Sequence, residues 1–408
     1  MGIKAVSAVA AVAVAVVSFQ AVLAPARGQG RSRVPVPAGP RSQERDVWVT
    51  PDRRGAVLRA ASTGPFSMLG VTWDDPDAVL TGTVEVRTRD TETGVWSDWQ
   101  RLDSEDGRGE ETARRGGTDP LWVGPSNGAE VRVAAAAAEN GASVLPTGLQ
   151  LDLVDPGHGP LTAPQAERLP GSAGHGGTAT ASAPRPAIVP RTGWGADESI
   201  SPAAPAYLPG GKIKAVVVHH TADSNGFTCA EAPAVVRGIY AYHVRQLGWK
   251  DIGYNFLVDP CGTIYEGRKG GVDRPVLGAH AYGFNSQTAG VAVLGTYTDA
   301  APGGAALGAV ARLAAWKLGQ YGVDPAGTIT LTAGADGTNY FRKSWKMGDR
   351  LSLPAVHGHR DGYNTMCPGD LLYAELPTIR ALASAVPADI AKTTDDGPTP
   401  ETAGKARD

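Results

Sequence analysis

Apolar and polar residues follow two different patterns along the chain. Between Asp46 and about Asp155, short β-type runs alternate apolar and polar positions, as at Val84, Val86 and Thr88, and turn residues separate the runs. Alternation of this kind predicts an antiparallel β-sandwich.

From about residue 188 to residue 385, β-type runs take turns with segments whose apolar residues have helical spacing. We expect strands at residues 214–218, 254–258, 263–266 and 290–296, and helices at residues 230–247, 307–319 and 371–385. Strands separated by helices predict an α/β domain with a central mixed sheet flanked by helices.

Three segments show no periodicity. Residues 27–45 are rich in Pro, Gly and Arg and predict a disordered lead, residues 157–187 have the composition of a flexible linker, and residues 387–408 predict a disordered tail. The two domains are therefore expected at residues 46–156 and 188–386. Within the second domain, residues 326–353 look like an insertion, which is either a basic lip for an acidic polymer or a solvated hairpin.

The N-terminus has the pattern of an export signal. Lys4 gives a weak positive charge, an apolar run extends from Ala5 to Val17, and Ala24-Pro25-Ala26 offers small residues for cleavage. We expect a signal peptide at residues 1–26 and a secreted or wall-associated protein. The alternative is an uncleaved anchor, but the run is short for a membrane span, so no stable span is expected after processing.

Length and charge narrow the classes of partner. A chain of 408 residues exceeds one ordinary core, which favours two domains. The net charge of -3 gives no reason to expect nucleic acid or an anionic membrane as partner. We expect a monomer.

Candidate metal chemistry lies near the C-terminal end of the chain and at the end of one predicted strand. His219 follows the apolar run 215–218, and His359 and Cys367 lie in a later loop. Two imidazoles and a thiolate are ligands that zinc accepts, and a catalytic zinc keeps three protein ligands with one open position. The alternative is that each histidine is an ordinary surface or core residue.

The other two cysteines bear on the same interpretation. If Cys367 is a zinc ligand, Cys229 and Cys261 remain to form one disulfide, as an oxidising compartment favours. The alternative is that both are free buried thiols.

The first domain is rich in tryptophan, with Trp48, Trp73, Trp96, Trp99 and Trp122. Aromatic side chains on its surface would suit wall-glycan binding, whereas buried ones would belong to the core.

Several short motifs of the second domain occur in the order typical of one family. They are Arg-Thr-Gly-Trp-Gly-Ala at 191–196, Val-Val-Val-His-His-Thr-Ala at 216–222, Tyr-His at 242–243, Gly-Trp-Lys-Asp-Ile-Gly-Tyr-Asn-Phe-Leu-Val at 248–258, Gly-Thr-Ile-Tyr-Glu-Gly-Arg at 262–268, Gly-Ala-His at 278–280, Gly-His-Arg-Asp at 358–361 and Cys-Pro-Gly at 367–369. Over residues 190–385 the chain resembles the peptidoglycan recognition protein and type 2 N-acetylmuramoyl-L-alanine amidase family.

The resemblance implies a role for individual residues. His219, His359 and Cys367 match the zinc ligands of the family, and Tyr254 and Thr365 match residues at its catalytic centre. The matches to the substrate-binding cleft are His220, Thr221, His243, Gly248, Trp249 and His280. The Gly248-Trp249 pair resembles the version that accepts a diaminopimelate stem peptide rather than a lysine one.

The reaction implied by the resemblance is zinc-dependent hydrolysis of the amide between the lactyl group of N-acetylmuramate and L-alanine of the peptidoglycan stem. Members of the family that only bind peptidoglycan lack the Cys ligand, so Cys367 favours the enzyme. The alternative function is a non-catalytic peptidoglycan-binding protein. No residue stands out as the general base; Glu266 and Asp361 lie in suitable motifs, and Asp361 could instead hold a ligand imidazole.

Overall fold

The computed structural model describes residues 39–103, 110, 112–137, 143–157 and 183–386, all within one compact unit, Pro37–Asp408. The expected signal peptide, most of the expected lead and linker, and the expected tail after residue 386 lie outside the described residues. Among the helices that are described, none is both long and apolar enough to cross a membrane.

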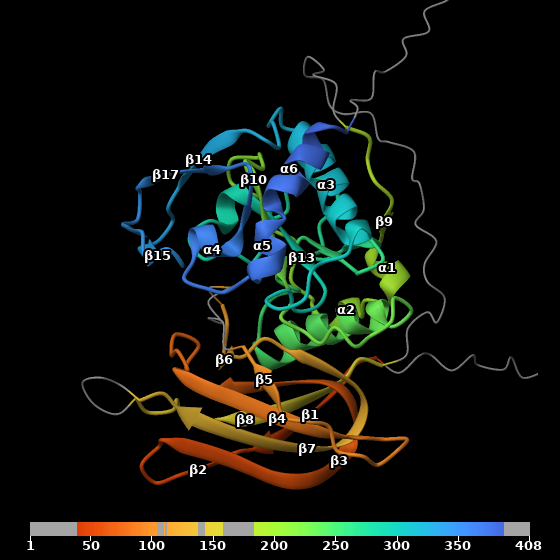
Figure 1. Cartoon of the computed structure of the whole chain (residues 1–408), viewed down its shortest axis with the longest axis vertical. Coiled ribbons are helices and arrows are strands. Elements are labelled where there is room, and N and C mark those ends of the chain that lie inside the picture. The colour runs from red at the N-terminus through yellow and green to blue at the C-terminus, as the bar shows by residue number, and fades with distance from the viewer. Residues whose placement is uncertain (1–38, 104–109, 111, 138–142, 158–182, 387–408) are drawn as a thin grey trace, which may run out of the picture. The chain divides into compact units, whose positions relative to one another are not determined.

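The N-terminal domain is an antiparallel β-domain, as its alternating sequence predicts (Figure 1). Its strands are β1 (Arg41–Asp46), β2 (Trp48–Val49), β3 (Gly55–Trp73), β4 (Gly82–Asp90), β5 (Gln100–Leu102), β6 (Gly116–Gly117), β7 (Leu121–Ala135) and β8 (Gln150–Asp155). Over the described residues they pair in the order β1-β8-β3-β7-β4-β5, and β2 and β6 also pair with β3. The long strand β3 makes the sheet continuous, and residues of β3, β4, β7 and β8 enclose one apolar core.

Strand β1 begins at Arg41, inside the segment that was expected to be a disordered lead. Its sequence has no apolar alternation, yet its backbone pairs with β8 from Arg41–Asp155 to Asp46–Gln150. A β-ladder requires only backbone N–H and C=O groups, so polar edge strands leave a weak sequence signal. The disorder prediction is corrected for residues 41–45.

The tryptophans of this domain divide between core and surface. Trp73 and Trp122 are buried, whereas Trp48 is 61% exposed. Trp96 and Trp99 both lie against the Arg87 guanidinium, at 5.3 and 5.1 Å from the ring centres. Sugar binding by this surface stays a prediction.

The C-terminal domain contains a mixed sheet, which confirms the α/β prediction. In the described part of the chain this sheet has the order β18-β10-β13-β11-β12-β9; β12 is antiparallel to β11 and every other neighbouring pair is parallel. Its strands are β9 (Ile188–Val189), β10 (Ala215–His220), β11 (Phe256–Val258), β12 (Ile264–Glu266), β13 (Thr288–Val293) and β18 (Val356–Gly358).

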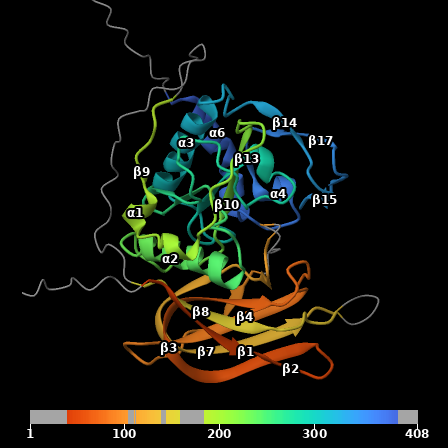
Figure 2. The same ribbon diagram turned by 180° about the vertical axis from the view of Figure 1, so that it is seen from behind.

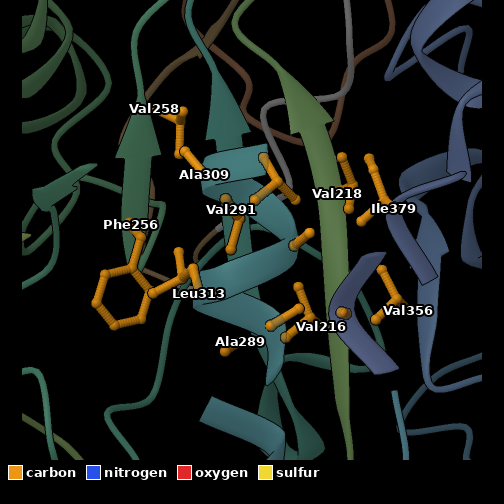
Figure 3. Packing of buried hydrophobic residues seen from close by; sticks show 14 of the residues in the cluster. Val216, Val218, Phe256, Val258, Ala289, Val291, Ala309, Leu313, Val356 and Ile379 are labelled. Atoms are coloured by element: carbon orange, nitrogen blue, oxygen red, sulfur yellow. The ribbon is translucent and has the colours of Figure 1, made fainter. Parts of the chain in front are cut away.

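Helices cover the two faces of this sheet. The described helical segments of this domain are α1 (Arg191–Trp194), the 3₁₀-helix η1 (Glu198–Ile200), α2 (Ala232–Ala241), the π-helix η2 (Tyr242–Gln246), the 3₁₀-helix η3 (Asn285–Gln287), α3 (Gly304–Gly319), α4 (His359–Gly362), α5 (Asp370–Ala374) and α6 (Leu376–Ser384). Helices α3 and α6 lie side by side in both ribbon views (Figure 1, Figure 2). Figure 3 shows Ala309 and Leu313 of α3 beside Phe256 and Val291 of the sheet. Residues of α2 belong to a second core cluster together with Leu257 and Tyr265.

The observed helices differ from the predicted ones at two places. The helix predicted over residues 230–247 is α2 followed by the π-helix η2, and the helix predicted over residues 371–385 is divided into α5 and α6. The expected insertion forms two small antiparallel pairs, β14 (Thr328–Thr332) with β17 (Arg350–Pro354) and β15 (Gly337–Thr338) with β16 (Ser344–Trp345). The predicted Cys229–Cys261 disulfide is present and joins the start of α2 to the turn between β11 and β12.

The two domains share packed side chains. Met68, Trp122 and Val154 of the N-terminal domain belong to the same buried cluster as α2. In addition, the Tyr242 hydroxyl donates a hydrogen bond to the Thr118 carbonyl oxygen at 3.0 Å. Both domains therefore bury apolar surface against each other.

Candidate metal centre

Two adjacent parallel strands bring two histidines to the same edge of the sheet. Strand β10 is buried over all its residues, and Val218 of β10 stands opposite Gly358 of β18. The residues that follow this pair are His219, the next residue of β10, and His359, the first residue of α4, so the parallel register places them together. Their ring centres lie 4.5 Å apart.

The third donor reaches this edge because the loop after α4 folds back on the helix. The Arg360 backbone N–H donates to the Cys367 carbonyl oxygen at 3.0 Å, and the Arg360 guanidinium contacts Asp370 at 2.7 Å. The Thr365 hydroxyl accepts a hydrogen bond from the Cys367 N–H at 2.9 Å. These contacts place the Cys367 Sγ 3.6 Å from His219 Nδ1.

The arrangement suits a single metal ion. One ligand atom each from His219, His359 and Cys367 can be chosen so that all lie within 4.8 Å of one another. Burial lowers the pKa of His219 well below its ordinary value and that of His359 to about 3, so both imidazoles are neutral and their lone pairs can bind a metal. A His-His-Cys donor set is typical of zinc, and three protein donors are the number found in catalytic zinc sites.

A further histidine contacts the candidate metal ligand His219. His280 Nδ1 lies 3.1 Å from His219 Nε2, on the opposite side of the His219 ring from Cys367, and the two rings are nearly perpendicular at 85°. His280 is fixed by its own backbone N–H, which donates to the Asn285 side chain at 2.8 Å. Such contacts orient a ligand imidazole and select its tautomer. His280 was expected to line the substrate cleft, and its contact with His219 was not predicted from the sequence.

Tyr254 lies on the same side of the domain, between two of the predicted site histidines. Its ring centre is 5.3 Å from that of His219 and 6.0 Å from that of His243. The structure therefore brings Tyr254 and Thr365, the two predicted catalytic residues, next to the candidate metal ligands.

Comparison with known proteins agrees with this geometry. Residues 209–370 match the family described as N-acetylmuramoyl-L-alanine amidase, and residues 26–156 match a family described as Rv3811 N-terminal galactose-binding domain-like. The peptidoglycan-recognition protein SC1a/b of Drosophila simulans is 43% identical over 167 residues, which are 41% of this chain and 74% of that protein. The chain belongs to the peptidoglycan-recognition protein and N-acetylmuramoyl-L-alanine amidase family.

Other relatives match the same part of the chain. The human N-acetylmuramoyl-L-alanine amidase is 35% identical over 198 residues, covering 47% of this chain and 28% of the human protein. Among solved structures, a Drosophila PGRP-LB variant in complex with tracheal cytotoxin is 25% identical, covers 47% of this chain and 93% of its own, and superposes with a TM-score of 0.36.

Two of the predicted cleft residues of this amidase-family domain accept hydrogen bonds from backbone N–H groups of the domain. The His220 Nδ1 accepts the Tyr297 N–H at 3.3 Å, and the Thr221 hydroxyl accepts the Gly295 N–H at 2.9 Å. Both side chains are buried, and burial lowers the pKa of His220 to about 3. They fix the loop after β13 next to the end of β10; their predicted contact with substrate stays a prediction.

Three other predicted cleft residues, His243, Gly248 and Trp249, lie in η2 and the turn that follows it. His243 stacks near Trp249, with ring centres 4.4 Å apart, and its Nδ1 accepts the Gly253 N–H at 3.1 Å. Burial lowers the pKa of His243 to about 3, so this histidine is neutral. Gly248 has φ of 75°, a conformation that glycine adopts readily.

The two acidic candidates for a general base have other partners. The Asp361 carboxylate accepts hydrogen bonds from the Gly358 N–H and the Tyr373 hydroxyl, at 2.9 and 2.8 Å. It therefore fixes the start of α4. Glu266 accepts the Arg191 N–H at 3.3 Å on the far strand β12.

Proposed function

We propose that this protein is a zinc-dependent N-acetylmuramoyl-L-alanine amidase that cleaves the amide between the lactyl group of N-acetylmuramate and the L-alanine of peptidoglycan stem peptides. The observation that carries the proposal is the convergence of His219, His359 and Cys367 at one edge of the sheet. A zinc ion held by these three side chains would supply Lewis acidity and would lower the pKa of a bound water to about 7.

The protein's own residues would prepare this chemistry. The buried, neutral imidazoles of His219 and His359, together with the Cys367 thiolate, hold the metal, while His280 orients the His219 ring. The Tyr254 hydroxyl is our candidate for the donor that stabilises negative charge on the scissile carbonyl oxygen, a role in which one donor contributes about 3 kcal/mol. Thr365 acts on the centre through the Cys367 backbone.

The substrate class follows from family membership and from the turn after η2. Peptidoglycan fragments with a diaminopimelate stem are the favoured substrates, with Gly248 and Trp249 near the stem peptide. The disulfide between Cys229 and Cys261 is consistent with an oxidising compartment, so we infer that the protein acts outside the cytoplasm, at or near a cell wall.

Defined muropeptides provide the test. The wild-type protein, purified with zinc, should release the intact stem peptide from muramoyl peptides, as seen by the product masses. Cys367→Ala should bind less zinc and cleave at a rate at least about 100-fold lower. Met366→Ala is a matched control, because Met366 lies in the same loop with 40% exposure and supplies no ligand.

Each outcome bears on one claim. Undiminished cleavage by Cys367→Ala would overturn the metal assignment. A zinc-loaded wild-type protein that binds muropeptides but releases no product would establish the non-catalytic recognition protein in place of the amidase.

A further inference from the structure

A short segment of the N-terminal domain covers the turn that carries Gly248 and Trp249. The Arg114 N–H donates to the Leu247 carbonyl oxygen at 2.8 Å. A Cβ atom added to Gly248 would lie 2.4 Å from the Arg114 side chain. Glycine at this position therefore accommodates the neighbouring domain as well as the left-handed turn.

Within this segment, Glu110 bonds to two parts of the amidase-family domain. Its Oε1 lies 2.8 Å from the Arg268 guanidinium, and its Oε2 accepts the Lys250 N–H at 2.7 Å. The Glu110 and Arg268 side chains are only 9% and 11% exposed. A carboxylate of one domain is thus paired with a guanidinium of the other in a largely desolvated position, where removing one partner is costly.

The ion pair borders a cavity of about 530 Å³ that both domains line. The N-terminal domain supplies Pro76 and Ala113 besides Glu110, and the amidase-family domain supplies Arg268, Gly278 and Ala279. Gly278 and Ala279 immediately precede His280, which contacts the candidate metal ligand His219. The wall of the cavity is therefore continuous in sequence with a residue that contacts the candidate metal ligand.

An adjacent carboxylate and guanidinium in the lining of a partly apolar cavity favour a ligand that carries both charges itself. We propose that Glu110 is a specificity-determining residue of the peptide site, where it binds the ammonium group at the end of a stem-peptide side chain whose carboxylate faces Arg268. A side chain that ends in a free amino acid, with both groups on one carbon, has this pattern of charge. The inference rests on the proposed function and makes the N-terminal domain part of the substrate site.

The test compares two substrates that differ only at the proposed contact. One is a muramoyl tripeptide with a free meso-diaminopimelate side chain, and the other has its side-chain amine acetylated. The wild-type protein should prefer the free amine by roughly 10-fold in kcat/KM, since acetylation removes the positive charge that Glu110 would bind. Glu110→Gln, which retains an acceptor for the Lys250 N–H, should bring this ratio close to one.

A matched control removes the same charge elsewhere in the domain. Glu92→Gln lies in an exposed turn after β4 and should keep the wild-type ratio. If Glu110→Gln also keeps it, the inference is wrong. Failure of this inference can be told apart from failure of the proposed function. Calorimetry on the Cys367→Ala background measures the affinities for both substrates without turnover, with Glu110 and with Glu110→Gln.

The ion pair could instead serve only to join the two domains, and a charge exchange separates the two roles. The Glu110→Arg, Arg268→Glu double variant keeps opposite charges at the interface but exchanges their places. If the pair binds the ligand, the exchanged protein should unfold at a temperature near that of the wild type and still lose the preference for the free amine. If the exchanged protein keeps the wild-type preference for the free amine, the proposal is wrong.

Discussion

Substitution of Gly290 by alanine offers a sharp test of how the metal centre is built. Gly290 lies in β13, whose backbone pairs with β10, the strand that carries His219. A Cβ atom at this position would lie 2.4 Å from Cγ of His280 and 2.7 Å from its Cδ2 and Nδ1. The imidazole of His280 thus occupies the space that any larger residue would need.

The size of the effect follows from these distances. Carbon atoms in contact normally lie about 3.5–4.0 Å apart, so the His280 ring must withdraw by roughly 1 Å. The His219–His280 contact, now 3.1 Å, would then exceed hydrogen-bonding distance. We expect a loss of about 1–3 kcal/mol in unfolding free energy from overpacking, and a fall of about 10–100-fold in zinc affinity from loss of the orienting contact.

Chelator competition measures the zinc affinity, and denaturant unfolding measures the stability of the same preparations. Gly308→Ala is the matched control, because Gly308 lies in α3 and a Cβ there meets only the flexible end of Arg312, at 3.2 Å. That variant should retain its zinc affinity and gain up to about 1 kcal/mol of stability, as alanine favours a helix over glycine.

A double variant separates the two consequences. His280→Ala should itself lower zinc affinity, and Gly290→Ala added to it should lower the affinity no further, because both changes remove one contact. Zinc affinity of Gly290→Ala equal to that of Gly308→Ala would refute the role given to His280, whatever the loss in stability.

Three further predictions concern stability. Replacing Cys229 and Cys261 together by serine should cost about 4 kcal/mol, by the chain-entropy relation for a loop closed over 32 residues, and unfolding under non-reducing conditions that shows less than about 1 kcal/mol would contradict it. Leu313→Ala should cost about 2–5 kcal/mol in denaturant unfolding, because Leu313 is fully buried in the core of Figure 3, and a cost below about 1 kcal/mol would be inconsistent with that packing. Burial raises the pKa of Asp152 to about 7, so the folded protein holds a proton that the unfolded chain releases between about pH 4 and pH 7, and stability contributed by this group falls as the pH rises through that window. Asp152→Asn should remove this part of the pH dependence of unfolding, and an unchanged profile would show that Asp152 is not the group responsible.

Much of the scaffold of the metal centre could be predicted from the local sequence. A run of β-branched residues before His219 is typical of a buried parallel strand, and the structure confirms it as β10. The order of strands and helices along the sequence was sufficient to predict the mixed sheet. The pairing of Cys229 with Cys261 followed from the number of cysteines once Cys367 was set aside as a ligand.

Other features depend on contacts between distant residues. Nothing in the apolar spacing marks the change from α2 to the π-helix at Tyr242. The break between α5 and α6 did have a local signal, since Pro377 stands in the first turn of α6. The contact of His280 with His219 had an indirect sequence signal, because Gly278 and Gly290 leave the space that the His280 ring fills.

The sequence suggested a wall-binding module joined to an enzyme through a flexible linker. Met68 and Trp122 pack against α2, however, so the domains cannot be studied separately by simple truncation. Removing residues 27–180 would expose this apolar surface and would also remove Glu110, the proposed partner of the substrate ammonium group. A loss of activity in such a truncated protein would then combine unfolding, lost wall affinity and lost peptide recognition. Point variants avoid this ambiguity: Glu110→Gln alters one charge at the proposed peptide site, and substitution of the exposed Trp48 alters only the outer surface of the N-terminal domain. If wall affinity depends on that surface, the Trp48 variant should bind intact walls less tightly while it cleaves soluble muropeptides at the wild-type rate.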